Sequence, residues 1–329
     1  MKISHFLQPG TQISALGVVS GEWVYDIRVA WALGELEVSV TNNLTETICD
    51  NLESGALQAL GIRLQSLPPD QVVEGKYALA EIELLAPVRP RSFRDFYAFE
   101  AHVKNARKRR GLEMQPEWYE QPVFYFSNTA SIQGPDADVR KPPDTNALDY
   151  ELELAVVIGK EGRDVPVDEA DSYIAGFTIL NDWSARDLQM REMKVGLGPA
   201  KGKDFATSIG PFLVTPDELE DRSLPLPELG EGSKEGASRG NRYDLTMTAR
   251  VNGKEYSRGN AKEMNWTFAE LIAQASRNTT ILPGDLIGSG TVGTGCILEI
   301  QDNVHPWLQV GDAVELEIEK LGILRNRVV

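Results

Sequence analysis

Short apolar runs of strand length, rather than helices, fill most of the chain after residue 90. They lie at residues 156–158, 174–180, 245–251, 286–289, 297–300 and 314–318. The clearest helix begins at Thr267, where Thr267 and Glu270 form a capping box ahead of an apolar helical face. Because the strands do not alternate regularly with helices, the pattern favours a β-rich α+β sandwich, roll or barrel over a doubly wound parallel sheet.

The first 85 or so residues have the pattern of a separate, smaller unit. Two strands are expected at 13–19 and 22–27, and a helical stretch with one apolar face at 44–60. The proline-spaced segment 86–91 suits a boundary. We therefore predict a small N-terminal α+β domain over residues 1–86 and a larger domain over residues 87–329. A long surface loop, rich in glycine, serine and charge, is expected at 221–242.

The net charge of −16 argues against nucleic acid and an anionic membrane as partners. No apolar run reaches the roughly 18 residues needed to span a bilayer, and the first ten residues lack the apolar stretch of a secretory signal. We therefore expect a cytoplasmic protein. The two cysteines, Cys49 and Cys296, are far apart. They are too few for a zinc site made of thiolates and do not imply a disulfide framework.

Two glutamates stand at the start of the most apolar expected strand. Alternate residues of a strand share a face, so Glu151 and Glu153 lie together within residues 148–158. Their carboxylates, about 7 Å apart by strand geometry, repel each other at a partly buried edge, and a cation between them would remove that cost. The alternative is an exposed strand end with two solvated glutamates.

A third carboxylate, Asp182, stands where the strand at 174–180 gives way to an expected helix near Ser184. An Asp at such a corner is also a common helix N-cap, which is the alternative role. Arg186 and Gln189 share one face of that helix because they are three residues apart. For this pair the alternative is a solvated surface.

Histidine is scarce in the chain, and His102 begins a strongly basic stretch at 104–110. Such a stretch is unusual in so acidic a protein. One or two of its arginines, pointed at a site, would supply the positive charge that an acidic substrate needs. The alternative is a solvated basic helix.

Residues 288–293 match the pattern G-x-G-x-x-G. A dinucleotide site requires a helix to open there, whereas residues 294–300 have the pattern of a strand. We therefore reject a dinucleotide site and expect these glycines to allow a close backbone approach or a tight turn.

Seven segments between residues 90 and 329 match, in order and spacing, the motifs of one enzyme family. They are Asp95-Phe96-Tyr97 with His102, Pro122-Val123-Phe124-Tyr125, Leu148-Asp149-Tyr150-Glu151-Leu152-Glu153, Asn181-Asp182-Trp183-Ser184-Ala185-Arg186-Asp187-Leu188-Gln189, Gly202-Lys203-Asp204-Phe205-Ala206-Thr207, Ser289-Gly290-Thr291 and Leu298-Glu299-Ile300. On these motifs the chain resembles the fumarylacetoacetase (fumarylacetoacetate hydrolase) family. The resemblance implies that family's mixed β-sandwich or roll as the catalytic domain, preceded by a small N-terminal domain, and a homodimer.

The resemblance also assigns roles to individual positions. It implies that a divalent cation is bound by Asp95, Glu151, Glu153 and Asp182; that His102 and Glu299 activate water; that Arg186, Gln189 and Lys203 stabilise negative charge; and that Tyr97, Tyr125, Thr291 and Arg110 contact substrate. The arginine is ambiguous by one residue, since Arg109 fits as well. An all-oxygen site selects a hard cation, with Mg²⁺ the first expectation and Ca²⁺ or Mn²⁺ next. Long-chain members carry a tyrosine where this chain has Met193.

The activity implied by the resemblance is hydrolysis of the carbon–carbon bond next to a ketone. The substrate would be a small anionic β-diketo acid such as fumarylacetoacetate, fumarylpyruvate or an acylpyruvate. One alternative is a metal-dependent decarboxylase or isomerase of a small oxo acid such as oxaloacetate. Another is a non-catalytic, Ca²⁺-stabilised binding module, which explains the carboxylates but not His102 with Glu299.

Overall fold

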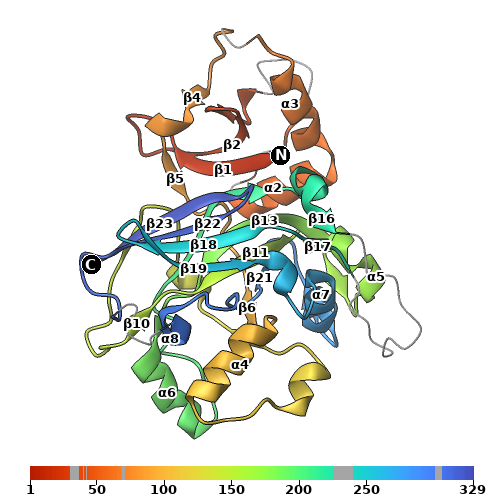
Figure 1. Cartoon of the computed structure of the whole chain (residues 1–329). Coiled ribbons are helices and arrows are strands. Elements are labelled where there is room, and N and C mark those ends of the chain that lie inside the picture. The colour runs from red at the N-terminus through yellow and green to blue at the C-terminus, as the bar shows by residue number, and fades with distance from the viewer. Residues whose placement is uncertain (30–36, 40, 42, 69–70, 225–239, 301–305) are drawn as a thin grey trace.

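A computed structural model describes residues 1–329 apart from 30–36, 40, 42, 69–70, 225–239 and 301–305 (Figure 1). Its main element is one large, open, mostly antiparallel sheet. In spatial order its strands are β4 (Lys76–Ala78), β3 (Trp23–Asp26), β2 (Ser14–Ser20), β1 (Lys2–Leu7), β15 (Thr207–Val214), β13 (Ile174–Asn181), β11 (Leu152–Ile158), β21 (Leu286–Gly288), β6 (Phe93–Phe96) and β7 (Phe124–Phe126), with β5 (Glu83–Leu85) beside β1 and β8 (Ile132–Gln133) beside β15. Because β4 and β7 end the sheet unjoined, it is not a closed barrel.

A second sheet packs against one face of the first. Its order is β19 (Lys254–Asn260), β18 (Thr246–Val251), β22 (Ala313–Ile318), β23 (Gly322–Val328) and β9 (Asp138–Val139). Between the sheets lies a core to which β13 contributes Phe177 and Ile179, and the second sheet Met247 and Leu316. All four side chains are fully buried. The two layers therefore form the expected sandwich-like, β-rich α+β architecture.

The remaining elements are short. Three antiparallel ribbons pair β10 (Leu148–Asp149) with β14 (Ser184–Ala185), β12 (Gly162–Arg163) with β20 (Thr280–Ile281) and β16 (Ser223–Leu224) with β17 (Arg242–Tyr243). The α-helices of the described residues are α2 (Leu44–Glu53), α3 (Ala56–Gln65), α4 (Glu100–Arg109), α5 (Val167–Ala170), α6 (Arg186–Val195), α7 (Phe268–Ser276) and α8 (Ile297–Ile300). Six single-turn or short 3₁₀ segments in the described residues are η1 (Leu79–Glu81), η2 (Pro116–Tyr119), η3 (Thr129–Ser131), η4 (Asp171–Tyr173), η5 (Pro216–Arg222) and η6 (Ala261–Glu263).

Most of the sequence-based expectations agree with these elements. The alternation of β11 is as predicted, since Leu154 and Val156 face the core between the sheets, while Ala155 and Val157 face the opposite core with helices α2 and α3. The capping box at Thr267 starts α7. The helical stretch at 44–60 is two helices, broken at Gly55, whose φ of 75° is left-handed. Most of the loop expected at 221–242 lies outside the described residues.

One expected strand is wrong. Residues Ile297–Ile300 form the short helix α8, although their apolar, β-branched pattern is typical of a strand. The cause is a distant carboxylate: Asp149 accepts hydrogen bonds from the amides of Ile297 (2.8 Å) and Leu298 (3.1 Å) and so caps the first turn. The reason given for rejecting a dinucleotide site therefore fails, but these amides are already bound and are not free for a pyrophosphate.

The N-terminal strands belong to the same sheet as the later ones. Lys2 and Ile3 of β1 pair with Val214 and Leu213 of β15. In Figure 1 this unit lies at the top, with β1, β2 and β4 beside α3. The boundary between residues 86 and 87 stays a prediction. No helix among the described residues is both long and apolar enough to cross a bilayer.

Candidate active site

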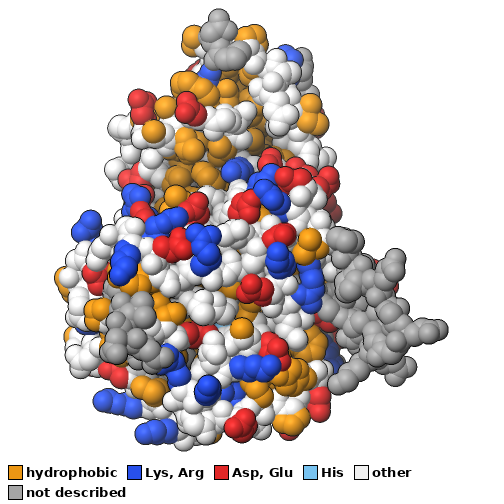
Figure 2. Space-filling model, in the orientation of Figure 1, with side chains coloured by type: hydrophobic (Ala, Val, Ile, Leu, Met, Phe, Trp, Pro, Cys, Tyr) orange, Lys and Arg blue, Asp and Glu red, His pale blue; other side chains and the backbone are white. Residues whose placement is uncertain are grey.

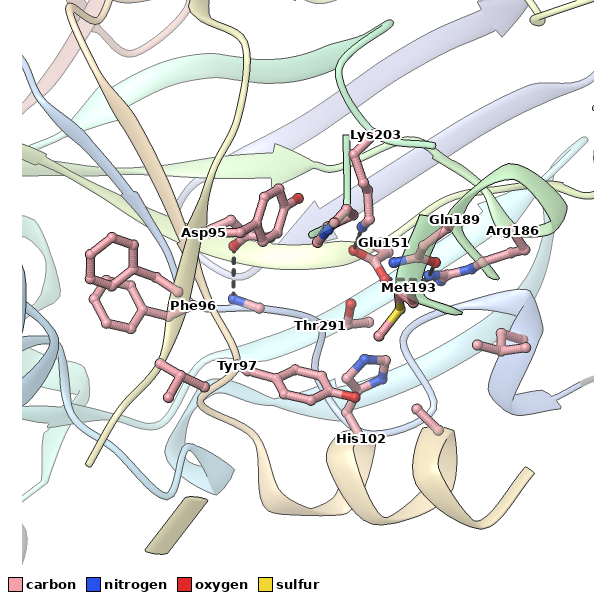
Figure 3. Close-up of a pocket in the computed structure, with 18 of the residues that line it drawn as sticks. Asp95, Phe96, Tyr97, His102, Glu151, Arg186, Gln189, Met193, Lys203 and Thr291 are labelled. Carbon is pink, nitrogen blue, oxygen red and sulfur yellow. Dashed lines mark hydrogen bonds and ion pairs between the residues drawn. The ribbon is translucent and has the colours of Figure 1, made fainter. Parts of the chain in front are cut away.

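A cavity of about 330 Å³ opens at the end of strands β6, β11 and β21, between helices α4 and α6 (Figure 3). This volume suits a small molecule. All the site residues predicted from the sequence line it except Asp182 and Glu299; those that do are Asp95, Tyr97, His102, Arg110, Tyr125, Glu151, Glu153, Arg186, Gln189, Lys203 and Thr291. Asp182 and Glu299 lie directly behind this lining and bind residues in it, as described below.

Three carboxylates meet in the floor of the cavity. Asp95 comes from β6, Glu153 from β11, and Glu151 from the residue before β11, and each offers an oxygen within 4.8 Å of the others. All three are buried. The alternative of solvated glutamates at an exposed strand end is therefore excluded.

Gly288 of β21 makes this approach possible. It lies between the two carboxylate-bearing strands, opposite Asp95 on β6 and opposite Ala155 on β11. A Cβ at Gly288 would lie 2.4 Å from Oδ1 of Asp95 and 3.2 Å from Oε2 of Glu153. Only glycine leaves room for both carboxylates, so the glycine segment serves the close approach expected from the sequence.

The electrostatics of the cluster are those of a cation site. Burial, and then repulsion by neighbouring carboxylates, raises the pKa of Asp95 and of Glu153 well above the ordinary values. Burial is also the main cause that raises the pKa of Asp182. Burial alone would raise the pKa of Glu151 too, but the charges of Lys203 and Arg186 outweigh it and lower that pKa.

The unpaired oxygens of the cluster provide a test of whether a metal fits. Within the described part of the chain, no group donates a hydrogen bond to Oε2 of Glu153 or to Oδ1 of Asp182, although both atoms are buried. Buried polar atoms normally have partners. A hard cation held by carboxylate oxygens would satisfy both atoms and neutralise the repulsion, so the residues present fit a divalent metal.

Lys203 links the fourth carboxylate, Asp182, to Glu151. Its Nζ donates to Oδ2 of Asp182 at 2.6 Å and also to Oε2 of Glu151. The hydroxyl of Tyr125 donates to the same Asp182 oxygen. Asp182 does not cap α6, whose N-cap is Ala185, so the alternative role as a helix cap is excluded. Figure 3 shows Lys203 beside Glu151 in the upper part of the cavity.

A histidine and a glutamate form a hydrogen-bonded pair on the opposite side. Nδ1 of His102, on α4, lies 2.7 Å from Oε2 of Glu299, on α8. Asn105 donates to the other oxygen of Glu299 at 3.0 Å. Burial alone would raise the pKa of Glu299, but its interactions with His102 and Asn105 outweigh burial and lower that pKa. A carboxylate on Nδ1 fixes the ring and leaves Nε2 as the atom that can accept a proton.

Arg186 faces the cavity from the start of α6 and is buried, contrary to the solvated alternative. Its Nη2 lies 2.9 Å from Oε1 of Glu151, and its Nη1 donates to Oε1 of Gln189 at 3.2 Å. Since that amide oxygen is occupied, the NH₂ group of Gln189 is left to donate toward the cavity.

The outer part of the cavity combines apolar walls with one guanidinium. Val123, Met190 and Met193 line it together with Arg110, and Nη1 of Arg110 lies 3.6 Å from Sδ of Met193. Arg109 instead donates to the backbone carbonyl of Glu299 at 2.7 Å. Of the two arginines left open by the sequence, Arg110 is therefore the one at the cavity.

The prediction from the sequence missed Asp149, which is fully buried behind Arg186. Its Oδ2 accepts from Nε of Arg186 at 2.8 Å. The sequence contained a signal for Asp149, because it stands two residues before Glu151 and thus in the same every-second-residue pattern as Glu151 and Glu153. However, the strand is interrupted between β10 and β11, and the side chain of Asp149 points toward α6 instead of into the cavity.

Residues 91–329 match the sequence model described as "Fumarylacetoacetate (FAA) hydrolase C-terminal". The chain belongs to the fumarylacetoacetate hydrolase family. This is an enzyme family, and nothing in the match supports a non-catalytic module. The matched region begins just before β6 and contains every residue of the cavity described above.

Two curated relatives illustrate the range of activities in the fumarylacetoacetate hydrolase family. Fumarylacetoacetase of Arabidopsis thaliana is 31% identical over 74% of this chain and 66% of its own length. The mitochondrial oxaloacetate tautomerase FAHD2A of Homo sapiens is 36% identical over 64% of this chain and 59% of its own length. The matched region thus covers less than two thirds of each relative.

A solved member of the fumarylacetoacetate hydrolase family shares the fold over the whole chain. It is fumarylacetoacetate hydrolase from the psychrophile Exiguobacterium antarcticum, with a TM-score of 0.70 at 27% identity, covering 100% of this chain and 99% of that one. The small N-terminal unit is therefore part of the shared architecture.

Proposed function

We propose that the chain is a metal-dependent hydrolase that cleaves the carbon–carbon bond next to a ketone in a small β-diketo acid. The observation that carries this proposal is the His102–Glu299 pair at 2.7 Å, which lies on the same cavity as the buried carboxylates. Hydrolysis needs a base that activates water, whereas decarboxylation and enolisation involve no attacking water.

The metal would be held by Asp95, Glu151, Glu153 and Asp182, and Mg²⁺ is the ion we propose first. When bound, such an ion polarises a ketone as a Lewis acid. Ca²⁺ and Mn²⁺ also accept an all-oxygen ligand set. The Lewis-acid chemistry would be the same with each of these three ions, so a measurement of bound metal identifies the native one.

The chain's own residues can carry the proton transfers. Nε2 of His102 takes a proton from water while Glu299 holds the Nδ1–H, and the water oxygen attacks the ketone carbon. The third N–H of Lys203 and the NH₂ of Gln189 can donate to the oxygen on which negative charge develops. The carbon–carbon bond then breaks, and its electron pair leaves with the enolate carbon beside Arg186. That carbon takes the proton held on Nε2 of His102, which restores the base. One diketo acid and one water give one carboxylic acid and one methyl ketone.

The outer part of the cavity would select the acyl group. Val123, Met190 and Met193 offer an apolar wall, and Arg110 offers one positive charge. A short acyl chain that ends in a carboxylate fits this combination, because the carboxylate can pair with the guanidinium. Fumarylpyruvate and fumarylacetoacetate have such an end, whereas acetylpyruvate does not.

The rival activity is tautomerisation or decarboxylation of a small oxo acid such as oxaloacetate. It is supported by the human relative, which is named for oxaloacetate tautomerisation. That chemistry requires the carboxylate cluster and Arg186 to hold an enolate, but no attacking water. In tautomerisation the His102–Glu299 pair would move a carbon-bound proton of the oxo acid instead of activating water.

The deciding experiment follows the ultraviolet absorbance of the diketo group. Purified protein would be mixed with fumarylacetoacetate, fumarylpyruvate, acetylpyruvate and, separately, oxaloacetate, each with Mg²⁺ or with EDTA. Metal-dependent loss of a diketo acid, with the carboxylic acid and ketone identified by mass spectrometry, supports hydrolysis. Turnover of oxaloacetate alone would replace the proposal with its rival.

We also propose a homodimer, as the family resemblance implies. In Figure 2 hydrophobic side chains gather over the N-terminal unit, on the side where β1, β2 and β4 lie. A second copy of the chain could cover this face. Light scattering coupled to size-exclusion chromatography would give twice the mass of the 36.3 kDa chain for a dimer, and a value equal to that mass would reject it.

A further inference from the structure

Asp149 joins the two sides of the cavity from behind. Its side chain is fully buried. Oδ1 accepts from the amide of Ile297 at 2.8 Å, and Oδ2 accepts from the amide of Leu298 at 3.1 Å and from Nε of Arg186 at 2.8 Å. One carboxylate therefore binds both the first turn of α8, which carries Glu299, and the arginine at the start of α6.

We infer that Asp149 is a positioning residue that holds Glu299 and Arg186 in register with each other. The inference rests on the proposed function, in which Glu299 orients the base and Arg186 receives the departing enolate. The β10–β14 ribbon supports it, since Asp149 stands opposite Ser184, two residues before Arg186. In addition, the backbone of Leu148 accepts from the amide of Leu308 at 2.9 Å, which ties the chain beyond α8 to the same ribbon.

Asp149 links α8 to the arginine at the start of α6, which the other contacts of Glu299 do not do. The side chain of Glu299 is held by His102 and Asn105, both on α4, and by the thiol of Cys296 at 3.5 Å, and its backbone carbonyl accepts from Arg109 of α4. Its helix is only four residues long, and a helix this short has no stability of its own. The position of Glu299 relative to α6 therefore depends on Asp149, which fixes the backbone two residues before it.

Removal of the charge on Asp149 would affect both α8, which carries Glu299, and Arg186 at the start of α6. Asp149→Asn keeps the shape, and one amide oxygen can still accept from a backbone N–H. It loses the ion pair, so Nε of Arg186 is left without its carboxylate, and the guanidinium is drawn to Glu151 alone. Residues that orient a site from one layer away commonly cost 10–100-fold when altered. We expect kcat to fall by about 10–100-fold, with KM changed by less than about threefold.

The chain offers a matched control in Asp26. It too is buried and accepts from a backbone amide, that of Arg28 at 3.0 Å, and from Nε of Arg28 at 2.8 Å. It lies in the N-terminal unit, away from the cavity residues. Asp26→Asn should therefore cost stability through the loss of an ion pair whose carboxylate is buried and whose guanidinium is partly exposed, while kcat stays within twofold of the wild type.

A double-mutant cycle separates positioning from a general loss of structure. If Asp149→Asn only damages the structure, its fold-loss of kcat multiplies with that of Glu299→Gln, because the two changes act independently. If Asp149 acts through Glu299, Asp149→Asn should cost clearly less in kcat when Glu299→Gln is already present than in the wild type, and the remainder is the part that acts through Arg186. Multiplicative effects, or a kcat of Asp149→Asn equal to that of Asp26→Asn, would overturn the inference.

Hydrogen exchange of the wild-type protein gives a measurement that does not depend on a variant folding. The amides of Ile297 and Leu298 should be strongly protected, and exchange within seconds would overturn the inference as well. The proposed function is tested first, by turnover of a diketo acid by the wild-type chain. A wild type that hydrolyses none rejects that function and this role together; an active wild type with an unaffected Asp149→Asn rejects only the role.

Discussion

The buried carboxylate of Glu153 should make the metal-free protein less stable than its amide variant. Burial and the neighbouring carboxylates raise the pKa of Glu153 well above its ordinary value of 4.5. The folded chain then keeps a proton that the unfolded chain releases above pH 4.5, so stability falls as the pH rises from there toward the folded-state pKa. Glu153→Gln resembles the protonated side chain and removes this cost.

The size of the effect has an upper limit. The carboxyl can always take up its proton, so at pH 7 the destabilisation cannot exceed 2.5 pH units at about 1.4 kcal/mol each, or about 3.5 kcal/mol. A chain of 329 residues unfolds with an entropy of roughly 0.7 kcal/mol per kelvin. The metal-free Glu153→Gln variant should therefore melt up to about 5 °C above the metal-free wild type.

The difference in melting temperature between variant and wild type should shrink by more than about 2 °C when metal is added. At a metal concentration of about 100 times Kd the wild type gains about 2.7 kcal/mol, or roughly 4 °C. The variant has lost one charged ligand and should gain less than half of that. The measurement is calorimetric melting at pH 7 after chelation, and again with Mg²⁺ or Mn²⁺ at a concentration set by titration calorimetry.

A surface variant provides the control. Glu315 pairs with Arg325 at 2.6 Å on strands β22 and β23, and exposed pairs of this kind contribute about 1 kcal/mol or less. Glu315→Gln should therefore lose at most 1–2 °C or so and keep the full metal-induced shift. The reasoning is refuted if metal-free Glu153→Gln melts at or below the wild type, or if its metal-induced shift is unchanged.

Three further predictions concern single residues. His102→Ala should lower hydrolysis by about 10²–10⁴-fold with an unchanged metal Kd by titration calorimetry, and equal activity would reject its role. Arg110→Met should lower kcat/KM for fumarylpyruvate by about 10–100-fold, which corresponds to the loss of one charged hydrogen bond. The value of kcat/KM for acetylpyruvate should not change, and equal losses for the two substrates would contradict the role of Arg110. Gly290 has a φ of 75°, and a Cβ there would lie 2.3 Å from the carbonyl oxygen of Phe96. Gly253 has a similar φ of 79°, but a Cβ there would meet nothing within 4 Å, so Gly253→Ala should lower the free energy of unfolding only by the backbone strain of about 1–2 kcal/mol. Gly290→Ala should lower the free energy of unfolding by more, as measured by urea denaturation. Equal costs would show that the cavity floor yields to the methyl group.

The parts of the site that the sequence predicted are those set by short-range periodicity. The alternation of strand residues places Glu153 of β11 on a defined face, and the capping box at Thr267 defines the start of α7. The resemblance to the family added Asp95 and His102, which no local pattern joins to the glutamates. The structure brings these residues to one cavity.

The parts that the sequence did not predict depend on contacts between distant residues. Residues Ile297–Ile300 are helical because Asp149, about 150 positions earlier, binds their amides. The choice between Arg109 and Arg110 required the exact phase of α4, since one residue turns a helical side chain by about 100°. The sequence also left Asp182 as a possible helix cap, because strand-to-helix corners commonly place an Asp there for that purpose alone.

The pairing of β1 with β15 has a consequence for synthesis of the protein. Lys2 pairs with Val214, so about 210 residues must be made before β1, which also pairs with β2 and β5, meets β15, and this takes roughly 10–40 s at ribosomal rates. During that time the part of the β1 edge that β5 does not cover, at Lys2 and Ile3, stays unpaired, and an unpaired edge is a template for aggregation. Slow production at low temperature, or a chaperone that covers nascent strands, should therefore raise the yield of folded enzyme more than any change at the cavity.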